Sequence, residues 1–216
     1  MAGGFLNAFV CWTLADGKMG LFHFWKHNCK IRKNFPFFKL FICFLFVFPV
    51  LLNQSVKQAV VSALFTSVLA CAAVIDYKTM TIPDFLIVFI AVLTVPSFAL
   101  GLKPGLPDRL LGAAAGFGAM YALAVLSEKF LRKEGMGGGD IKLAAACGLI
   151  LGFRLNILAL ILSSFFALGM AALLKWVKPS AYENRQIPFA PPLAFAAFVC
   201  YYFGENIING YTRLWL

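Results

Sequence analysis

Long apolar runs separated by short polar stretches follow one another from about residue 40 onward. The pattern predicts apolar helices at roughly residues 40–54, 58–75, 84–101, 110–127, 141–152, 155–174 and 187–203. A helix needs about 20 mostly apolar residues to cross a hydrocarbon core about 30 Å thick. Because the run at 141–152 is too short to cross as a straight helix, the pattern predicts seven spans, or six with a broken or tilted hairpin over 141–174.

Composition places these helices in a membrane. The 216 residues are 62% hydrophobic and 13% charged, whereas soluble domains are about 45–50% apolar and about 25% charged. We therefore expect an all-α, polytopic transmembrane bundle in three parts. Residues 1–39 form a juxtamembrane segment, residues 40–203 form the transmembrane domain, and residues 204–216 form a C-terminal tail.

The distribution of basic residues predicts an orientation. With the N-terminus in the cytoplasm, 14 of the 19 Lys and Arg residues fall in inner segments, and the other 5 fall outside: Lys57, Lys103, Arg109, Arg154 and Arg213. This excess agrees with the positive-inside rule. The net charge of +10 does not indicate nucleic-acid binding, because beyond residue 40 no basic stretch is interleaved with aromatic residues.

The first 39 residues interleave basic and aromatic side chains. Such a segment is expected to lie on anionic headgroups, which attract each basic residue by about 1 kcal/mol, and no small-residue cleavage site follows it. We interpret it, with the run that follows, as a retained signal anchor. His23 and His27 have i, i+4 spacing but no third ligand, and the six cysteines form no C-x-x-C pair, so no metal site is predicted.

Three of the nine acidic residues are predicted at the inner rim of the bundle: Asp76, Asp84 and Asp140. Asp84 follows Pro83, and the start of a helix explains both residues. Asp76 ends an apolar run, where the helix dipole disfavours an acid. Ionisable residues at such positions indicate a functional site.

Asp140 closes the run GMGGGD and is followed at once by a new apolar helix. Gly135, Gly137, Gly138 and Gly139 give the backbone conformational freedom and allow close approach to other groups. Two carboxyl groups brought together share one proton, so one acts as a base on water while the other donates to a carbonyl oxygen. This is the chemistry of aspartic peptide hydrolysis. A flexible loop with a capping aspartate remains the simpler alternative.

The run at 110–127 contains small residues at helical spacing. Gly112 and Gly116 form a small-xxx-small pattern, which lets two helices in a membrane approach closely. We expect a tight helix crossing there.

Three segments occur together in an order that resembles a known family. IDYKTMTIPD contains Asp76, GMGGGDIKL contains Asp140, and IPFAPPLAFAA begins at Ile187. They resemble the motifs of type IV prepilin peptidases, the GxGD-type aspartyl proteases of bacterial inner membranes. The signal-peptide-peptidase and presenilin enzymes share the GxGD element, but the IPD sequence fits the prepilin enzymes better.

The resemblance implies an intramembrane endopeptidase that needs no metal or cofactor. It would remove the basic leader of type IV prepilins or pseudopilins at the cytoplasmic face. Asp76 and Asp140 would be the catalytic pair, and Gly137 and Gly139 would shape the approach to Asp140. Lys142 would orient or tune the adjacent acid, whereas Asp84 matches a motif position without a catalytic role.

The chain departs from the family pattern near its N-terminus. Many members carry two C-x-x-C pairs there and also methylate the new pilin N-terminus with S-adenosylmethionine. These pairs are missing here, so we expect peptidase activity alone. Two other functions are compatible with the residues: a component of a proton-coupled transporter that uses both acids, and a noncatalytic membrane scaffold. The sequence leaves the particular pilin substrate and the oligomeric state open.

Overall fold

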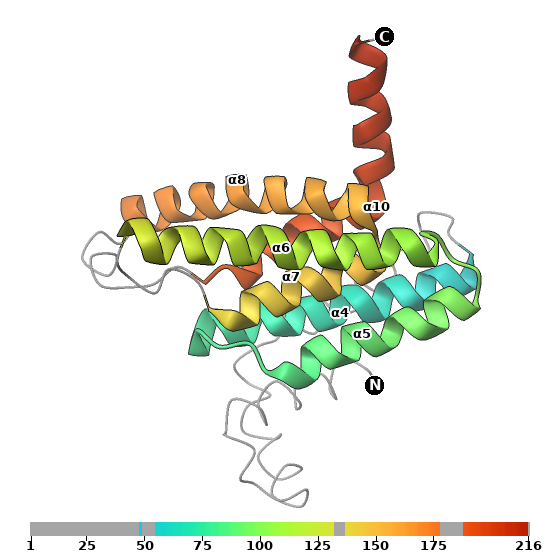
Figure 1. Cartoon of the computed structure of the whole chain (residues 1–216), viewed down its shortest axis with the longest axis horizontal. Helices are drawn as coiled ribbons and strands as arrows, with labels where there is room; N and C mark the ends of the chain where they lie inside the picture. Colours follow the sequence, from blue (N-terminus) through green and yellow to red (C-terminus); the bar gives the residue numbers. More distant parts are fainter. Residues whose placement is uncertain (1–47, 49–54, 132–136, 178–187, 216) are drawn as a thin grey trace, which may run out of the picture.

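The computed structural model describes residues 48, 55–131, 137–177 and 188–215. Within these ranges the chain forms six α-helices and no strand, as predicted. The helices are α4 (Val56–Thr79), α5 (Asp84–Ala99), α6 (Leu106–Leu131), α7 (Gly138–Leu151), α8 (Phe153–Val177) and α10 (Ala190–Trp215) (Figure 1). The juxtamembrane segment 1–39 and most of the first predicted span lie outside the described residues.

Each of the six later apolar runs forms its own helix. Gly152 separates α7 from α8, with a φ of 78° that favours glycine, so the run over 141–174 is a pair of helices rather than one. Among the described residues, three helical segments are long and apolar enough to cross a membrane: Val56–Thr79, Leu106–Phe130 and Phe153–Leu173. By contrast, the 14 residues of α7 extend only about 21 Å.

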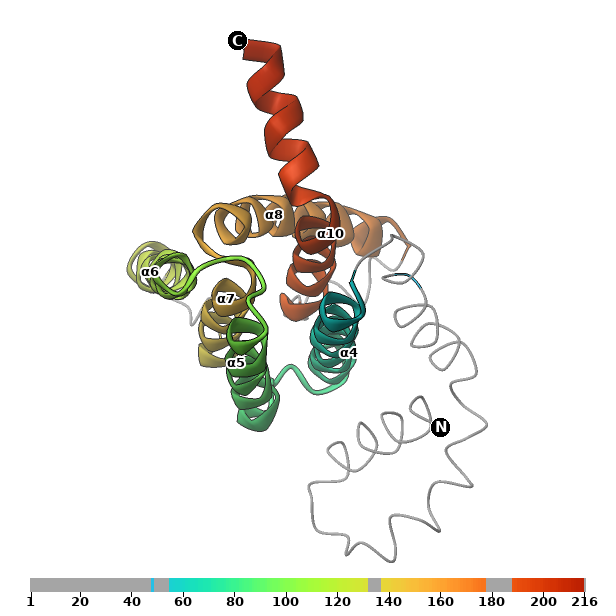
Figure 2. The same ribbon diagram turned by 90° about the vertical axis from the view of Figure 1, so that its right-hand side faces the viewer.

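The short helix α7 lies at the centre of the bundle. It contacts α5, α6, α8 and α10, and the end-on view shows it enclosed by its neighbours (Figure 2). Its side chains Leu143, Ala144, Cys147, Ile150 and Leu151 are buried in the hydrophobic core. The helix that carries Asp140 is therefore held by packing along most of its length.

Helices α6 and α7 cross with their backbones in contact. A Cβ atom added at Gly112 would lie 2.6 Å from the carbonyl oxygen of Gly148, and one added at Gly116 would lie 2.6 Å from that of Ala144. The buried side chain of Asn156 joins the crossing from α8, because its Nδ2 donates to the carbonyl oxygen of Gly112 at 2.9 Å. The tight crossing predicted from the small residues is confirmed.

A buried arginine closes the opposite end of the bundle from Asp140. Arg109 is 0% exposed, and its guanidinium donates to the carbonyl oxygens of Pro104, Leu102 and Leu149 and to the hydroxyl of Ser97, at 2.8–3.0 Å. The position of Arg109 in the sequence predicts an outer segment but not this burial. The buried side chain ties α5, α6 and α7 together.

Candidate active site

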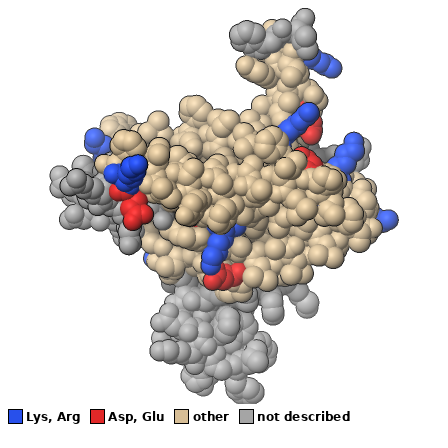
Figure 3. Space-filling model, viewed as in Figure 1, with Lys and Arg blue, Asp and Glu red and all other residues tan. Residues whose placement is uncertain are grey.

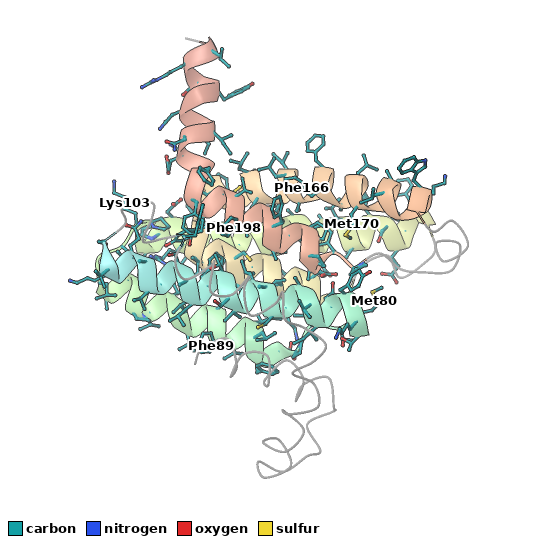
Figure 4. The ribbon with its side chains drawn as sticks, turned by 180° about the vertical axis from the view of Figure 1, so that it is seen from behind. Met80, Phe89, Lys103, Phe166, Met170 and Phe198 are labelled. Atoms are coloured by element: carbon teal, nitrogen blue, oxygen red, sulfur yellow. The ribbon has the colours of Figure 1, made fainter. Side chains whose placement is uncertain are left out.

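Three helix ends meet where Asp76 lies. Helix α4 ends there, and α7 and α10 both begin there. In Figure 4, Met80 marks this end of the bundle and Lys103 marks the other. Met80 terminates α4 with a left-handed φ of 53°, and its N–H donates to the carbonyl oxygen of Asp76 at 2.8 Å. Asp76 thus occupies the last turn of α4, where its side chain is only 5% exposed.

The carboxylate of Asp76 accepts a hydrogen bond from the start of α10. The N–H of Ala190 donates to Oδ2 of Asp76 at 3.1 Å, and Ala190 is fully buried. The first N–H groups of a helix have no partner inside the helix. Here Pro191 and Pro192 have no N–H, and that of Leu193 donates to the carbonyl oxygen of Phe189. Asp76 therefore satisfies the remaining donor at the start of α10.

Sequence reasoning missed this contact with Ala190. The signal was present in IPFAPP, since two prolines after an alanine leave a single free donor at a helix start. What the sequence could not supply was the partner, which lies 114 positions earlier in the chain.

Asp140 lies in the first turn of α7, before the apolar run at 141–152, and its surroundings differ from those of Asp76. Its N–H donates to the carbonyl oxygen of Gly137 at 3.1 Å, but the buried Oδ1 of its carboxyl group has no hydrogen-bond partner among the described residues. Burial, and secondarily the charge of Asp76, raises the pKa of Asp140 to about 7. The two acids are thus close enough to interact electrostatically, and Asp140 is mostly protonated below about pH 7.

The site is recessed within the bundle. Helices α7 and α8 meet at Gly152, at the far end. From there the 25 residues of α8 extend about 38 Å, whereas α7 extends only about 21 Å. Asp140 therefore begins its helix well inside the ends of α6 and α8, as Figure 1 shows.

The glycines before Asp140 act through their small size more than through unusual backbone angles. Gly137 precedes α7 with a φ of −70°, and Gly138 and Gly139 belong to the helix. A Cβ added at Gly139 would lie 3.1 Å from that of Ile82, in the connection between α4 and α5. The expected close approach is present at Gly139, whereas a Cβ added at Gly137 would lie 3.7 Å from Oδ2 of Asp140, an ordinary contact distance. Gly135 lies outside the described residues.

Lys142 contacts Asp84 instead of Asp140. Its Nζ lies 2.8 Å from Oδ1 of Asp84, with both side chains more than half exposed. The expectation that Lys142 orients or tunes the neighbouring acid Asp140 is not what the geometry shows. The ion pair joins the start of α5 to α7, and exposed pairs of this kind contribute about 0–1 kcal/mol.

Among the described residues, no group of three or more His, Cys, Asp or Glu side chains could hold a metal ion. His23 and His27 lie outside those residues. The chemistry available in this part of the chain is that of two carboxyl groups, one hydrogen-bonded at Asp76 and one buried with an unpartnered oxygen at Asp140.

Comparison with known proteins identifies the family of the chain. The model of the type IV leader peptidase family matches residues 63–172, a range that includes Asp76 and Asp140. No solved structure gives a significant match.

Three curated relatives are each named prepilin leader peptidase/N-methyltransferase. The protein of Bacillus subtilis (strain 168) is 30% identical over 71% of this chain and 59% of its own length. The protein of Xanthomonas campestris pv. campestris is 32% identical over 68% of this chain and 52% of its own length. The protein of Aeromonas hydrophila is 30% identical over 86% of this chain and 64% of its own length. The chain thus spans 52–64% of the length of these relatives. Together, the match over half of the chain and these identities show that the chain belongs to the type IV leader peptidase family.

Proposed function

We propose that this chain is an intramembrane aspartic endopeptidase that removes the basic leader of type IV prepilins or pseudopilins. The cut would be made at the cytoplasmic face of the bacterial inner membrane, with the N-terminus of the enzyme in the cytoplasm. The observation that carries the proposal is the pair Asp76 and Asp140, two interacting carboxyl groups recessed at one end of a membrane bundle. The family and the names of the relatives support the choice of substrate.

The unlike surroundings of the two acids suggest separate roles. Asp76 is buried, which disfavours its charged form, but it accepts the N–H of Ala190, which stabilises that form, and we therefore assign the role of base to Asp76. Burial and the neighbouring charge hold a proton on Asp140 near neutral pH, which makes Asp140 the acid.

In the proposed first step, Asp76 takes a proton from water as the water oxygen attacks the peptide carbonyl carbon. Asp140 donates its proton to the carbonyl oxygen, giving a neutral tetrahedral diol. In the second step, Asp76 passes its proton to the leaving nitrogen as the C–N bond breaks. The diol hydroxyl returns a proton to Asp140 as the new carboxyl group forms. Both acids regain the protonation states in which they started, so the proposed cycle uses only water besides the substrate.

The position of the pair also supports a peptidase over a transporter. A proton carrier requires acids along a path through the bilayer, whereas Asp76 and Asp140 lie at one end of their helices. Uncharged side chains cover much of the exposed surface of α6 and α8 (Figure 3), which suits contact with lipid. A substrate with an apolar helix could approach through that lipid and present its polar leader at the recessed end.

The test is cleavage of a full-length prepilin with a basic leader by the purified enzyme in lipid vesicles. Mass spectrometry should find one cut at the leader boundary, with the same rate in the presence of EDTA. Loss of cleavage with EDTA would contradict the two-acid mechanism, and an intact substrate across type IV pilins and pseudopilins would contradict the proposed function. With labelled S-adenosylmethionine present, we expect no methyl transfer to the product.

A further inference from the structure

The C-terminal part of α10 leaves the bundle. Gly204 is its last buried residue and packs against Leu155 near the start of α8. From Glu205 to Leu214 no residue is buried. Figures 1 and 2 show this segment turning away from the other helices and running across their common direction. We call residues 205–215 the crossing segment.

Apolar and polar residues occupy opposite sides of the crossing segment. At about 100° per residue, the apolar residues fall within about 120° of the helix circumference, and the polar residues fall within a separate arc of about 120°. The apolar residues are Ile207, Ile208, Tyr211 and Leu214, and the polar residues are Glu205, Asn206, Asn209, Thr212 and Arg213. Tyr211 and Leu214 are 64% and 85% exposed, so the apolar side has no cover within the described chain.

The direction of the crossing segment matches a membrane surface. Because α4, α6 and α8 contain the segments long enough to cross the bilayer, a helix running across them lies along the membrane plane. It leaves the bundle at the end marked by Lys103, opposite Met80 (Figure 4). The basic atoms on this segment in Figure 3 point away from the end of the bundle that Met80 marks in Figure 4.

We propose that the crossing segment binds the lipid–water interface at the end of the bundle opposite Asp76 and Asp140. Its apolar side enters the acyl region, and its polar side faces water. Tyrosine side chains such as that of Tyr211 favour the membrane–water interface. Amphipathic helices bind this interface more strongly the more apolar area they bury in it. Glu205 and Arg213 balance in charge, so zwitterionic lipid is sufficient. This inference needs only the membrane bundle and does not depend on the proposed peptidase activity.

The test uses the whole protein, free of native cysteines, in phosphatidylcholine vesicles. Nitroxide labels are placed by Tyr211→Cys on the apolar side and by Asn209→Cys on the polar side. Relaxation by oxygen, which concentrates in lipid, is compared with relaxation by a water-soluble nickel chelate. Leu168→Cys, at an exposed site on α8, and Lys103→Cys serve as the lipid and water references.

We expect oxygen to dominate at position 211 and nickel to dominate at position 209, with at least a several-fold difference in the ratio of the two effects. Labels at Leu214→Cys on the apolar side and Arg213→Cys on the polar side should give the same contrast. This second pair tests the proposal even if Tyr211→Cys or Asn209→Cys fails to fold. Nickel dominance at both 209 and 211 would place the segment in water and overturn the proposal. Dipolar broadening at 211 with shielding from both reagents would show a second copy of the chain on the apolar side, and would equally overturn it.

Discussion

Two carboxyl groups in unlike surroundings are the chemical core of the account. Asp76 accepts a hydrogen bond from an N–H at the start of α10, whereas Oδ1 of Asp140 is buried and has no partner in the part of the chain that the structure describes. A pair of carboxyl groups that titrate apart is how aspartic proteases divide the acid and base roles. One substitution can remove the ionisable group of Asp140, and another can remove the N–H that Asp76 accepts. The two substitutions should have different consequences.

Asp140→Asn should stabilise the fold at alkaline pH while abolishing cleavage. The pKa of Asp140 is raised from 3.8 to about 7, so its favourable contribution is complete below about pH 4 and is lost as the pH rises through 7. Asparagine stays neutral, so the variant should be more stable than wild type at pH 8 by on the order of 2 kcal/mol, a value reduced for partial exposure. Thermal unfolding in detergent at pH 8 and pH 4 measures the difference, which should vanish at the lower pH. Equal stability at both values would contradict the buried, proton-binding state of Asp140.

Ala190→Pro removes one hydrogen-bond donor from the site. Proline is tolerated at the first position of a helix, but its nitrogen cannot donate to Asp76. A hydrogen bond to a charged group is worth about 1.5–3 kcal/mol, so kcat should fall about 10- to 100-fold with little change in KM. The acidic limb of the pH–rate profile should also move to higher pH. Ala190→Gly keeps the N–H and should retain near wild-type kcat; an equal loss in both variants would assign Ala190 to packing alone.

At the level of elements, α7 is positioned by a backbone crossing. Gly148 faces the carbonyl oxygen of Gly112 so closely that an added Cβ would overlap it. Larger groups at such a contact cost about 1–3 kcal/mol, and any shift of α7 moves Asp140 with it. The crossing therefore links packing in the middle of the bundle to the geometry of the site.

Gly148→Ala should lower the unfolding temperature and reduce cleavage. The matched control is Gly118→Ala on α6, where an added Cβ meets no atom within 4 Å. The control should be neutral or up to about 1 kcal/mol more stable, because alanine favours a helix over glycine. Thermal unfolding of both variants in the same detergent checks the contrast, and a Gly148→Ala variant as stable as the control would disprove the tight crossing.

The sequence predicted the elements better than their partners. Apolar periodicity located the helices from α4 to α10, and the small residues of α6 predicted its close crossing. Both properties depend on residues near one another in the chain. The contact from Ala190 to Asp76, the burial of Arg109 and the pairing of Lys142 with Asp84 were not predicted, because each depends on how distant elements pack. Counting charges by sequence position could not distinguish a buried arginine from one facing water.

At the scale of the whole molecule, unequal helix lengths create the site. The long helices α4, α6 and α8 contain the spanning segments, whereas α7 is short and central and begins inside the bundle end. Asp140 is therefore placed at the depth of the last turn of α4, next to the start of α10. The carboxyl pair lies at one end of the membrane domain, and Arg109 lies at the other end, where it binds three carbonyl oxygens.

The most direct test of the account is cleavage of a prepilin in membranes by wild type, Asp76→Asn and Asp140→Asn, with Asp84→Asn as the matched control. Asp84 lies at the same end but is exposed and paired with Lys142, so its loss should leave most activity. With expression levels matched, we predict that both Asp76→Asn and Asp140→Asn abolish cleavage while the folded proteins persist. Full cleavage by either variant would remove that acid from the mechanism and contradict the central claim.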